Sequence, residues 1–279
     1  MDAAALLDRM GLSGHPSGIA GCRASGAARP ACDLDVVVFD GGDGFEEVPD
    51  GPAVIRHASL SEALPARLLG YDGMEVIHDE AWELRMLLSR IRARRPLLLV
   101  DHARRCLVEA LVCCQQAASP DLGSCWIKAA SCLLAGAVCA RGSLAPGPSH
   151  TLEALRSTGD PLAGLVARTL GAARATPTLL RRMSRSAEEL ARIAGMPHAS
   201  ICARSDALAA GSMGSDCYVY LCRVSSDALL SISRDPGRLR DSSKLLGTAL
   251  DAEPGAADAA EVADACNGML AGSAGPQAI

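Results

Sequence analysis

The residues best suited to chemistry are two aspartates that open an apolar segment. Asp33 and Asp35 stand at the start of the run 34–39, which is rich in β-branched residues and is predicted to be a buried strand. Side chains alternate along a strand, so the two carboxylates should lie on one face about 7 Å apart. Carboxylates this close repel each other unless a cation lies between them, and Mg²⁺ binds one or two carboxylates together with substrate phosphates. The pair therefore predicts a magnesium site.

A glycine-rich turn comes just before the aspartates. It runs from Gly21 to Gly26, with Cys22 and Arg23 inside it. A glycine has no Cβ, so its backbone can approach a ligand closely. Successive backbone N–H groups in such a turn can bind phosphate. We expect a phosphate-binding turn beside the acidic strand.

These residues together resemble the signature of the polymerase-β-type nucleotidyltransferases, which is Gly-Ser, a short segment ending in Gly, and an Asp-x-Asp strand. The resemblance covers about the first third of the chain. It implies that the triphosphate is bound by the turn residues Gly21, Cys22, Arg23 and Gly26. It also implies that Asp33 and Asp35 bind two catalytic Mg²⁺ ions. The implied activity is transfer of a nucleoside monophosphate from a nucleoside triphosphate, with ATP the expected one, to an acceptor hydroxyl.

The chain departs from the family pattern at two points. Cys22 replaces the family's serine, and a thiol is a weaker hydrogen-bond donor to phosphate than a hydroxyl. The family supplies a third carboxylate from a later strand, and Glu75 in the segment 74–78 is the candidate here. The earlier strand-like run 53–56 is the alternative equivalent of that strand, and it has no acid. These departures leave a second interpretation open. The domain would then be a catalytically degenerate nucleotidyltransferase fold that binds nucleotide or RNA and acts as a regulatory, antitoxin-like protein.

The spacing of apolar residues divides the chain into parts. Period-two spacing before Asp79 changes to helical spacing after it, and Pro96 is expected to end the first long helix. We predict an α+β nucleotidyltransferase-like domain over 1–95, with a small mixed sheet and helices on one side. An all-α helical domain should follow over 96–250, and then a flexible acidic tail over 251–279. Strands are expected near 18–20, 34–39, 53–56 and 74–78, with a loop over 40–52.

The charge distribution follows the same division. Net charge is −5 over residues 1–95, +5 over 96–250 and −5 over 251–279. Nearly all basic residues of the middle segment are arginines, which suit phosphate or carboxylate ligands. The excess is modest for a nucleic-acid surface, so RNA is a possible partner and not an expected one.

The lack of a secretory signal and of a membrane-spanning run predicts a cytoplasmic protein without a membrane partner. The chain has no run of about 18 uncharged apolar residues. Its twelve cysteines include no Cys-x-x-Cys pair. Cys125, Cys132 and Cys139 recur every seven residues, which favours small apolar positions at a helix–helix contact over a metal site.

Arg95 and His102 form a second candidate site. Their spacing resembles the Arg-x(4–6)-His motif of helical ribonuclease modules that often accompany minimal nucleotidyltransferases. That resemblance implies RNA cleavage with His102 as acid or base. We favour the simpler interpretation, in which an arginine ends one helix and a histidine begins the next.

Overall fold

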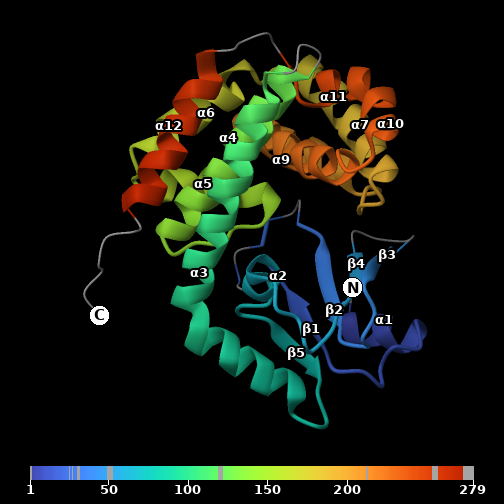
Figure 1. Ribbon diagram of the computed structural model, residues 1–279. Helices are drawn as coiled ribbons and strands as arrows, with labels where there is room; N and C mark the ends of the chain where they lie inside the picture. Colours follow the sequence, from blue (N-terminus) through green and yellow to red (C-terminus); the bar gives the residue numbers. More distant parts are fainter. Residues whose placement is uncertain are drawn as a thin grey trace. The chain divides into compact units, whose positions relative to one another are not determined.

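The computed structural model describes residues 2–24, 26, 28–29, 32–48, 53–118, 122–211, 213–252 and 257–272. The chain divides into two compact units, Met1–Leu99 and Val100–Ile279. Figure 1 shows a small sheet and helices in the first unit, and helices alone in the described part of the second. The sequence placed its domain boundary a few residues earlier, at 95–96.

The described part of the N-terminal unit contains a five-stranded mixed sheet in the order β3-β4-β2-β1-β5. β2 and β4 are parallel, and the other neighbouring pairs are antiparallel. The α+β class expected from the sequence is therefore confirmed. The strands are β1 (Ser17–Ala20), β2 (Leu34–Val38), β3 (Gly44–Glu47), β4 (Ala53–His57) and β5 (Glu75–His78).

Helices lie against both faces of this sheet, and the expectation of helices on one side was wrong. Helix α1 (Ala3–Arg9) packs Leu6 and Leu7 into a core cluster with Val36 and other side chains on the same face of β2 and β4. On the opposite face, the ring of Phe39 meets that of Tyr71 at 5.3 Å, at the end of α2 (Pro65–Gly70). Residues of β2 are buried on both faces, so each face needs an apolar cover.

The expected loop over 40–52 contains strand β3, which is a correction. β3 pairs antiparallel with β4, with Phe45 opposite Arg56. It is a four-residue edge strand with an exposed or half-buried pattern. Backbone hydrogen bonds to β4 hold this strand in the sheet. The strand therefore does not need alternating apolar side chains, which are the signal that predicts a strand from sequence.

Helix α3 (Glu83–Gln116) runs through Pro96 without a break, which corrects the predicted helix end at that residue. Asp79 accepts hydrogen bonds from the N–H groups of Leu84 at 3.2 Å and Arg85 at 2.9 Å, as expected for a residue that caps this helix. Pro96 is exposed, so water can satisfy the backbone carbonyl that it leaves without a donor. Buried Leu98 and Leu99 hold the next turn in place.

The described residues after β5 contain helices and no strand, as the sequence predicted. Short 3₁₀ helices η1 and η2 occupy Pro148–His150 and Ala172–Arg174. The α-helices that follow α3 are α4 (Gly123–Arg141), α5 (Thr151–Ser157), α6 (Leu162–Leu170), α7 (Pro177–Ile193), α8 (Ile201–Ala210), α9 (Gly214–Ile232), α10 (Pro236–Asp241), α11 (Ser243–Ala249) and α12 (Ala257–Gly272).

Helix α12 corrects the prediction of a flexible tail from residue 251 onward. Val262, Cys266 and Met269 of this helix are buried. They are spaced by four and three residues, so they share one helix face. The high content of Ala, Gly and Asp suggested disorder, but this short apolar stripe is enough to pack the helix.

Helix α4 is the central helix of the second unit. Cys125, Cys132 and Cys139 on it are buried, as expected for small apolar residues at helix contacts. In the part of the chain that the structure describes, α4 alone is long and apolar enough to cross a membrane, and 83% of that stretch is buried inside the fold. It therefore has the character of a core helix.

Candidate functional site

The glycine turn that follows β1 lies against the carboxylate of Asp35. Gly21 and Gly26 both adopt left-handed backbone conformations, with φ of +74° and +71°. These conformations are readily available only to glycine. A Cβ placed on Gly21 would lie 3.4 Å from Oδ2 of Asp35. The turn and the acidic strand therefore meet, as the sequence predicted.

Arg23 fastens this turn to the chain that enters β2. Its Nε donates hydrogen bonds to the carbonyl oxygens of Cys32 at 3.2 Å and Asp33 at 3.1 Å. Its Nη2 also donates to the Cys32 carbonyl, at 2.6 Å. Two of the three guanidinium nitrogens are thus committed to the backbone. Arg23 positions the turn, and the phosphate contact implied by the family resemblance is left to its remaining nitrogen.

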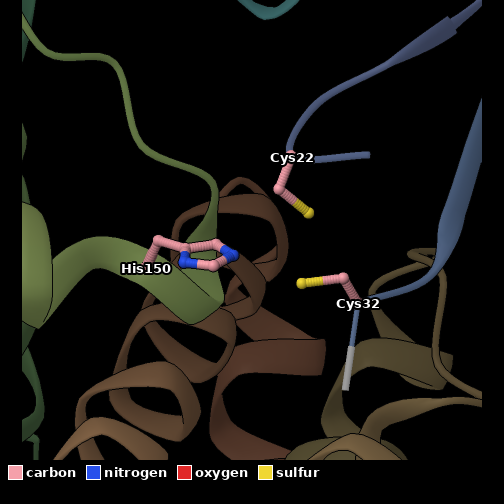
Figure 2. A group of neighbouring side chains, drawn as sticks. All are labelled: Cys22, Cys32 and His150. Carbon is pink, nitrogen blue, oxygen red and sulfur yellow. The ribbon is translucent and has the colours of Figure 1, made fainter. Parts of the chain in front are cut away.

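A second cysteine faces Cys22, a contact that was not predicted from the sequence. The sulfur atoms of Cys22 and Cys32 lie within 4.8 Å of each other, and Figure 2 shows them pointing toward one another. The hydrogen bond with Cys32, together with burial, raises the pKa of Cys22 well above its usual range. Cys22 therefore remains a neutral thiol. The only possible signal was the position of Cys32, directly before the aspartate pair.

The two predicted metal ligands lie at the start of β2. Asp33 is buried, whereas the side chain of Asp35 is 32% exposed. Nε of Arg56 lies 3.5 Å from Oδ1 of Asp35. In the parallel β2–β4 pairing, Asp35 is opposite Val54 and Val37 is opposite Arg56, so Arg56 shares the face of Asp35. Strand β4, beside the aspartates, contributes the cation of Arg56 to this site. The resembled family has a third carboxylate in its site.

The structure does not bring Glu75 to the aspartates. Glu75 is exposed on the edge strand β5 and pairs with Ile19, whereas Asp35 pairs with Ala20. Ile19 and Ala20 are consecutive residues of β1, and consecutive strand residues point to opposite faces. The register therefore puts Glu75 and Asp35 on opposite faces of the sheet. Sequence alone placed Glu75 on a strand but could not fix the register of that strand.

The two aspartates have few protein ligands beside them for a metal ion. Among the residues that the structure describes, no group of three or more metal-ligating side chains contains Asp33 or Asp35. One Mg²⁺ can be held by two carboxylates with water and phosphate oxygens completing its shell. A pair of ions about 4 Å apart needs bridging ligands that these two residues do not provide alone.

Arg95 and His102 each have a partner in their own surroundings. Nε of Arg95 donates to Oδ2 of Asp72 at 2.5 Å. The ring of His102 lies 3.7 Å from Sγ of Cys106 through its Nε2 atom. Burial and the nearby Arg223 guanidinium lower the pKa of His102, which favours its neutral form. Both residues lie inside the continuous helix α3, so the interpretation in which Arg95 ends one helix and His102 begins the next was wrong. Each residue contacts a partner near its own position instead.

The site thus combines a left-handed glycine turn, an acidic pair, a facing thiol pair and an arginine on the neighbouring strand. No model of a known protein family matches the chain, and no curated protein matches it in sequence.

Proposed function

We propose that the N-terminal unit is a nucleotidyltransferase-like domain that binds a nucleoside triphosphate, with ATP the expected one, together with one Mg²⁺ ion. The observation that carries the proposal is the approach of the Gly21 turn to Oδ2 of Asp35, 3.4 Å from an added Cβ. Phosphate-binding backbone and metal-binding carboxylate are therefore adjacent. A triphosphate with its metal ion needs these two groups side by side.

Each part of the site would have one task in binding. Backbone N–H groups of residues 21–24 and of Gly26 would donate hydrogen bonds to phosphate oxygens, and such bonds need no side chain. Asp33 and Asp35 would hold Mg²⁺, which would neutralise part of the phosphate charge. Arg23 keeps the turn in place through its bonds to the carbonyls of Cys32 and Asp33.

The same geometry favours the regulatory, non-transferring form of the fold. Nucleotidyl transfer by two metal ions requires one ion to activate the acceptor and another to stabilise the leaving pyrophosphate. Arg56 lies against Asp35, and Glu75 is on the opposite face. With only two carboxylates, the site supports ground-state binding of a metal–nucleotide complex better than catalysis.

Calorimetry of the full chain with ATP and MgCl₂ tests binding. We expect Asp33→Asn combined with Asp35→Asn to lower the affinity by about tenfold or more, because the metal loses both protein ligands. Glu75→Gln is the matched control, since it also removes an acid from the sheet, and it should leave the affinity unchanged. Circular dichroism confirms that each variant is folded. Unchanged affinity in the double variant would show that the two aspartates have a structural role only.

A pyrophosphate-release assay separates binding from transfer. We expect no magnesium-dependent release above that of the Asp35→Asn variant. Release that depends on Asp35 would establish nucleotidyl transfer and overturn the regulatory interpretation. Arg56→Ala sharpens the test, because it removes the cation beside Asp35 and should tighten Mg²⁺ binding.

A further inference from the structure

A pocket with a basic rim lies within the N-terminal unit, between the segment 60–62, α2 and the first half of α3. Its volume is about 160 Å³. The apolar lining includes Leu68 of α2 and Leu87 and Ile91 of α3, and Arg90 and Arg94 are the basic residues of the lining. The two arginines are four residues apart, so they lie one helical turn apart on the same side of α3.

These two arginines lack partners that neighbouring arginines have. The side chains of Arg90 and Arg94 are exposed and take part in no hydrogen bond or ion pair within the described part of the chain. By contrast, Arg67 contacts Asp43, and Arg85 contacts Asp79. Like charges one turn apart destabilise a helix by about 0.2–0.5 kcal/mol. The fold therefore tolerates an uncompensated positive pair at the pocket.

The single acid of the pocket does not neutralise this pair. The Glu62 carboxylate accepts hydrogen bonds from the N–H groups of Ala63 and Leu64, both at 2.8 Å, and from Arg67 at 3.2 Å. Burial opposes its ionisation, but the bonds from Leu64, Ala63 and Arg67 outweigh that effect and lower the pKa of Glu62. Its charge is already satisfied by groups other than Arg90 and Arg94.

An exposed apolar strip borders the arginines on the same helix. Met86 is 57% exposed and lies one turn before Arg90, and Leu97 is 62% exposed. Trp82, just before α3, is 65% exposed and has a left-handed backbone with φ of +62°. Large apolar side chains exposed together beside a basic rim are typical of protein interaction sites.

We propose that this surface is a docking site for an acidic amphipathic helix of a partner protein. One apolar side chain of the partner would fill the pocket, and carboxylates one helical turn apart would bind Arg90 and Arg94. A pocket of about 160 Å³ is smaller than the roughly 300–1,000 Å³ of small-molecule sites, so it suits a single side chain. A two-fold symmetric contact with a second copy of the chain would place its own arginines against these, which like-charge repulsion opposes. The proposal does not depend on nucleotide binding.

Selection from a displayed library of helical peptides tests the proposal. The full chain is the target, and the Arg90→Glu plus Arg94→Glu variant is used for counter-selection. We expect enrichment of Asp or Glu pairs four residues apart next to a large apolar residue. Lack of such enrichment would overturn the proposal.

The affinity of a selected peptide, measured by fluorescence anisotropy, then tests the position of the site. Arg90→Glu plus Arg94→Glu should weaken binding about tenfold or more, because attraction becomes repulsion. Arg92→Glu is the matched control on the same helix. Residues two positions apart do not share a helix face, so it should change the affinity by no more than about twofold. Equal losses in both variants would overturn the proposed site in favour of general charge attraction.

Two further measurements test whether an apolar side chain of the partner occupies the pocket and whether the partner is a protein or a membrane. Ser61→Phe puts a bulky side chain at the pocket lining and should abolish peptide binding, whereas retained affinity would contradict an anchor in the pocket. Vesicles of phosphatidylserine and phosphatidylcholine should not shift Trp82 fluorescence. A shift that Arg90→Glu plus Arg94→Glu removes would assign the surface to anionic membranes and overturn the protein-partner proposal.

Discussion

Charged residues have different surroundings in the two units. In the helical unit, Nζ of buried Lys128 donates to the hydroxyl of Tyr218 at 2.6 Å, and that hydroxyl donates to Oδ2 of Asp251 at 2.9 Å. In the N-terminal unit, Arg90 and Arg94 have no partner in the described residues and border an open pocket. Buried polar groups cost stability unless they are hydrogen-bonded, so the first arrangement serves folding. Charges left uncompensated at a surface are available for ligands.

The polar network of the helical unit also includes Arg174. Nε of Arg174 lies 3.1 Å from Oδ2 of Asp251, which itself has a left-handed backbone with φ of +47°. Burial is the main cause that raises the pKa of Tyr218, so its hydroxyl stays protonated and can donate. Such a network is expected to stabilise the unit and to have no ligand of its own.

The largest expected effect is the loss of the carboxylate at this network. Asp251→Asn keeps a side chain that tolerates the left-handed backbone, but it removes the negative charge that the Tyr218 hydroxyl and Arg174 contact. We expect unfolding free energy to fall by about 3–5 kcal/mol, the range for a broken buried ion pair. Urea unfolding measures it through the fluorescence of Trp126, which is 6% exposed, in a Trp82→Phe background.

The exposed Arg168–Glu261 pair provides the control for that experiment. Glu261→Gln should cost about 0–1 kcal/mol, because solvent screens an exposed pair. An Asp251→Asn effect no larger than this would show that the buried network contributes little. The buried network of the helical unit would then not differ from an exposed ion pair in its contribution to the free energy of unfolding.

The next effect concerns α3, whose two halves belong to the two units. Pro96→Ala should stabilise the protein by up to about 3 kcal/mol, because proline inside a helix lacks an N–H donor and clashes with the preceding turn. Urea unfolding followed separately by Trp82 and Trp126 shows which unit gains. Equal shifts would indicate that the units unfold together. A loss of stability would mean that Pro96 is needed at this point of the helix.

A pH effect from His102 is expected in the helical unit. Burial and the Arg223 guanidinium lower the pKa of His102 below its ordinary value of 6.5. The unfolded chain then binds a proton at a pH at which the folded chain does not. Stability from this group is present above pH 6.5 and falls as pH decreases through and below that value. His102→Gln should flatten the pH dependence of urea midpoints between about pH 5 and 7. An unchanged slope would exclude His102 as its cause.

The smallest expected effect is at the nucleotide turn. Cys22→Ser restores the hydroxyl that the resembled family uses, so ATP affinity should stay the same or improve by about 0.5–1 kcal/mol. Calorimetry with MgCl₂ measures it. Cys32→Ser is the matched control, because it changes the facing thiol and leaves the turn residue intact. A clear loss of affinity in Cys22→Ser alone would show that the thiol pair itself shapes the turn.

Local patterns determined most of the secondary structure and the position of the candidate site. The alternation around Asp33 and Asp35 and the flanking glycines are local signals, and they placed a strand and a turn where the structure has them. The change from period-two to helical spacing near Asp79 likewise separated the sheet from the helices. Such signals depend on neighbours in sequence, so they are visible without the fold.

Contacts between distant segments were decided only by the tertiary structure. The register of β1 against β2 and β5 put Glu75 on the face opposite Asp35, and one residue of slip would have reversed this result. The parallel pairing of β2 and β4 brought Arg56 to Asp35, 21 positions along the chain. Cys32 meets Cys22 because Arg23 folds the turn back onto the strand entry. These outcomes depend on strand pairing, and no local spacing encodes it.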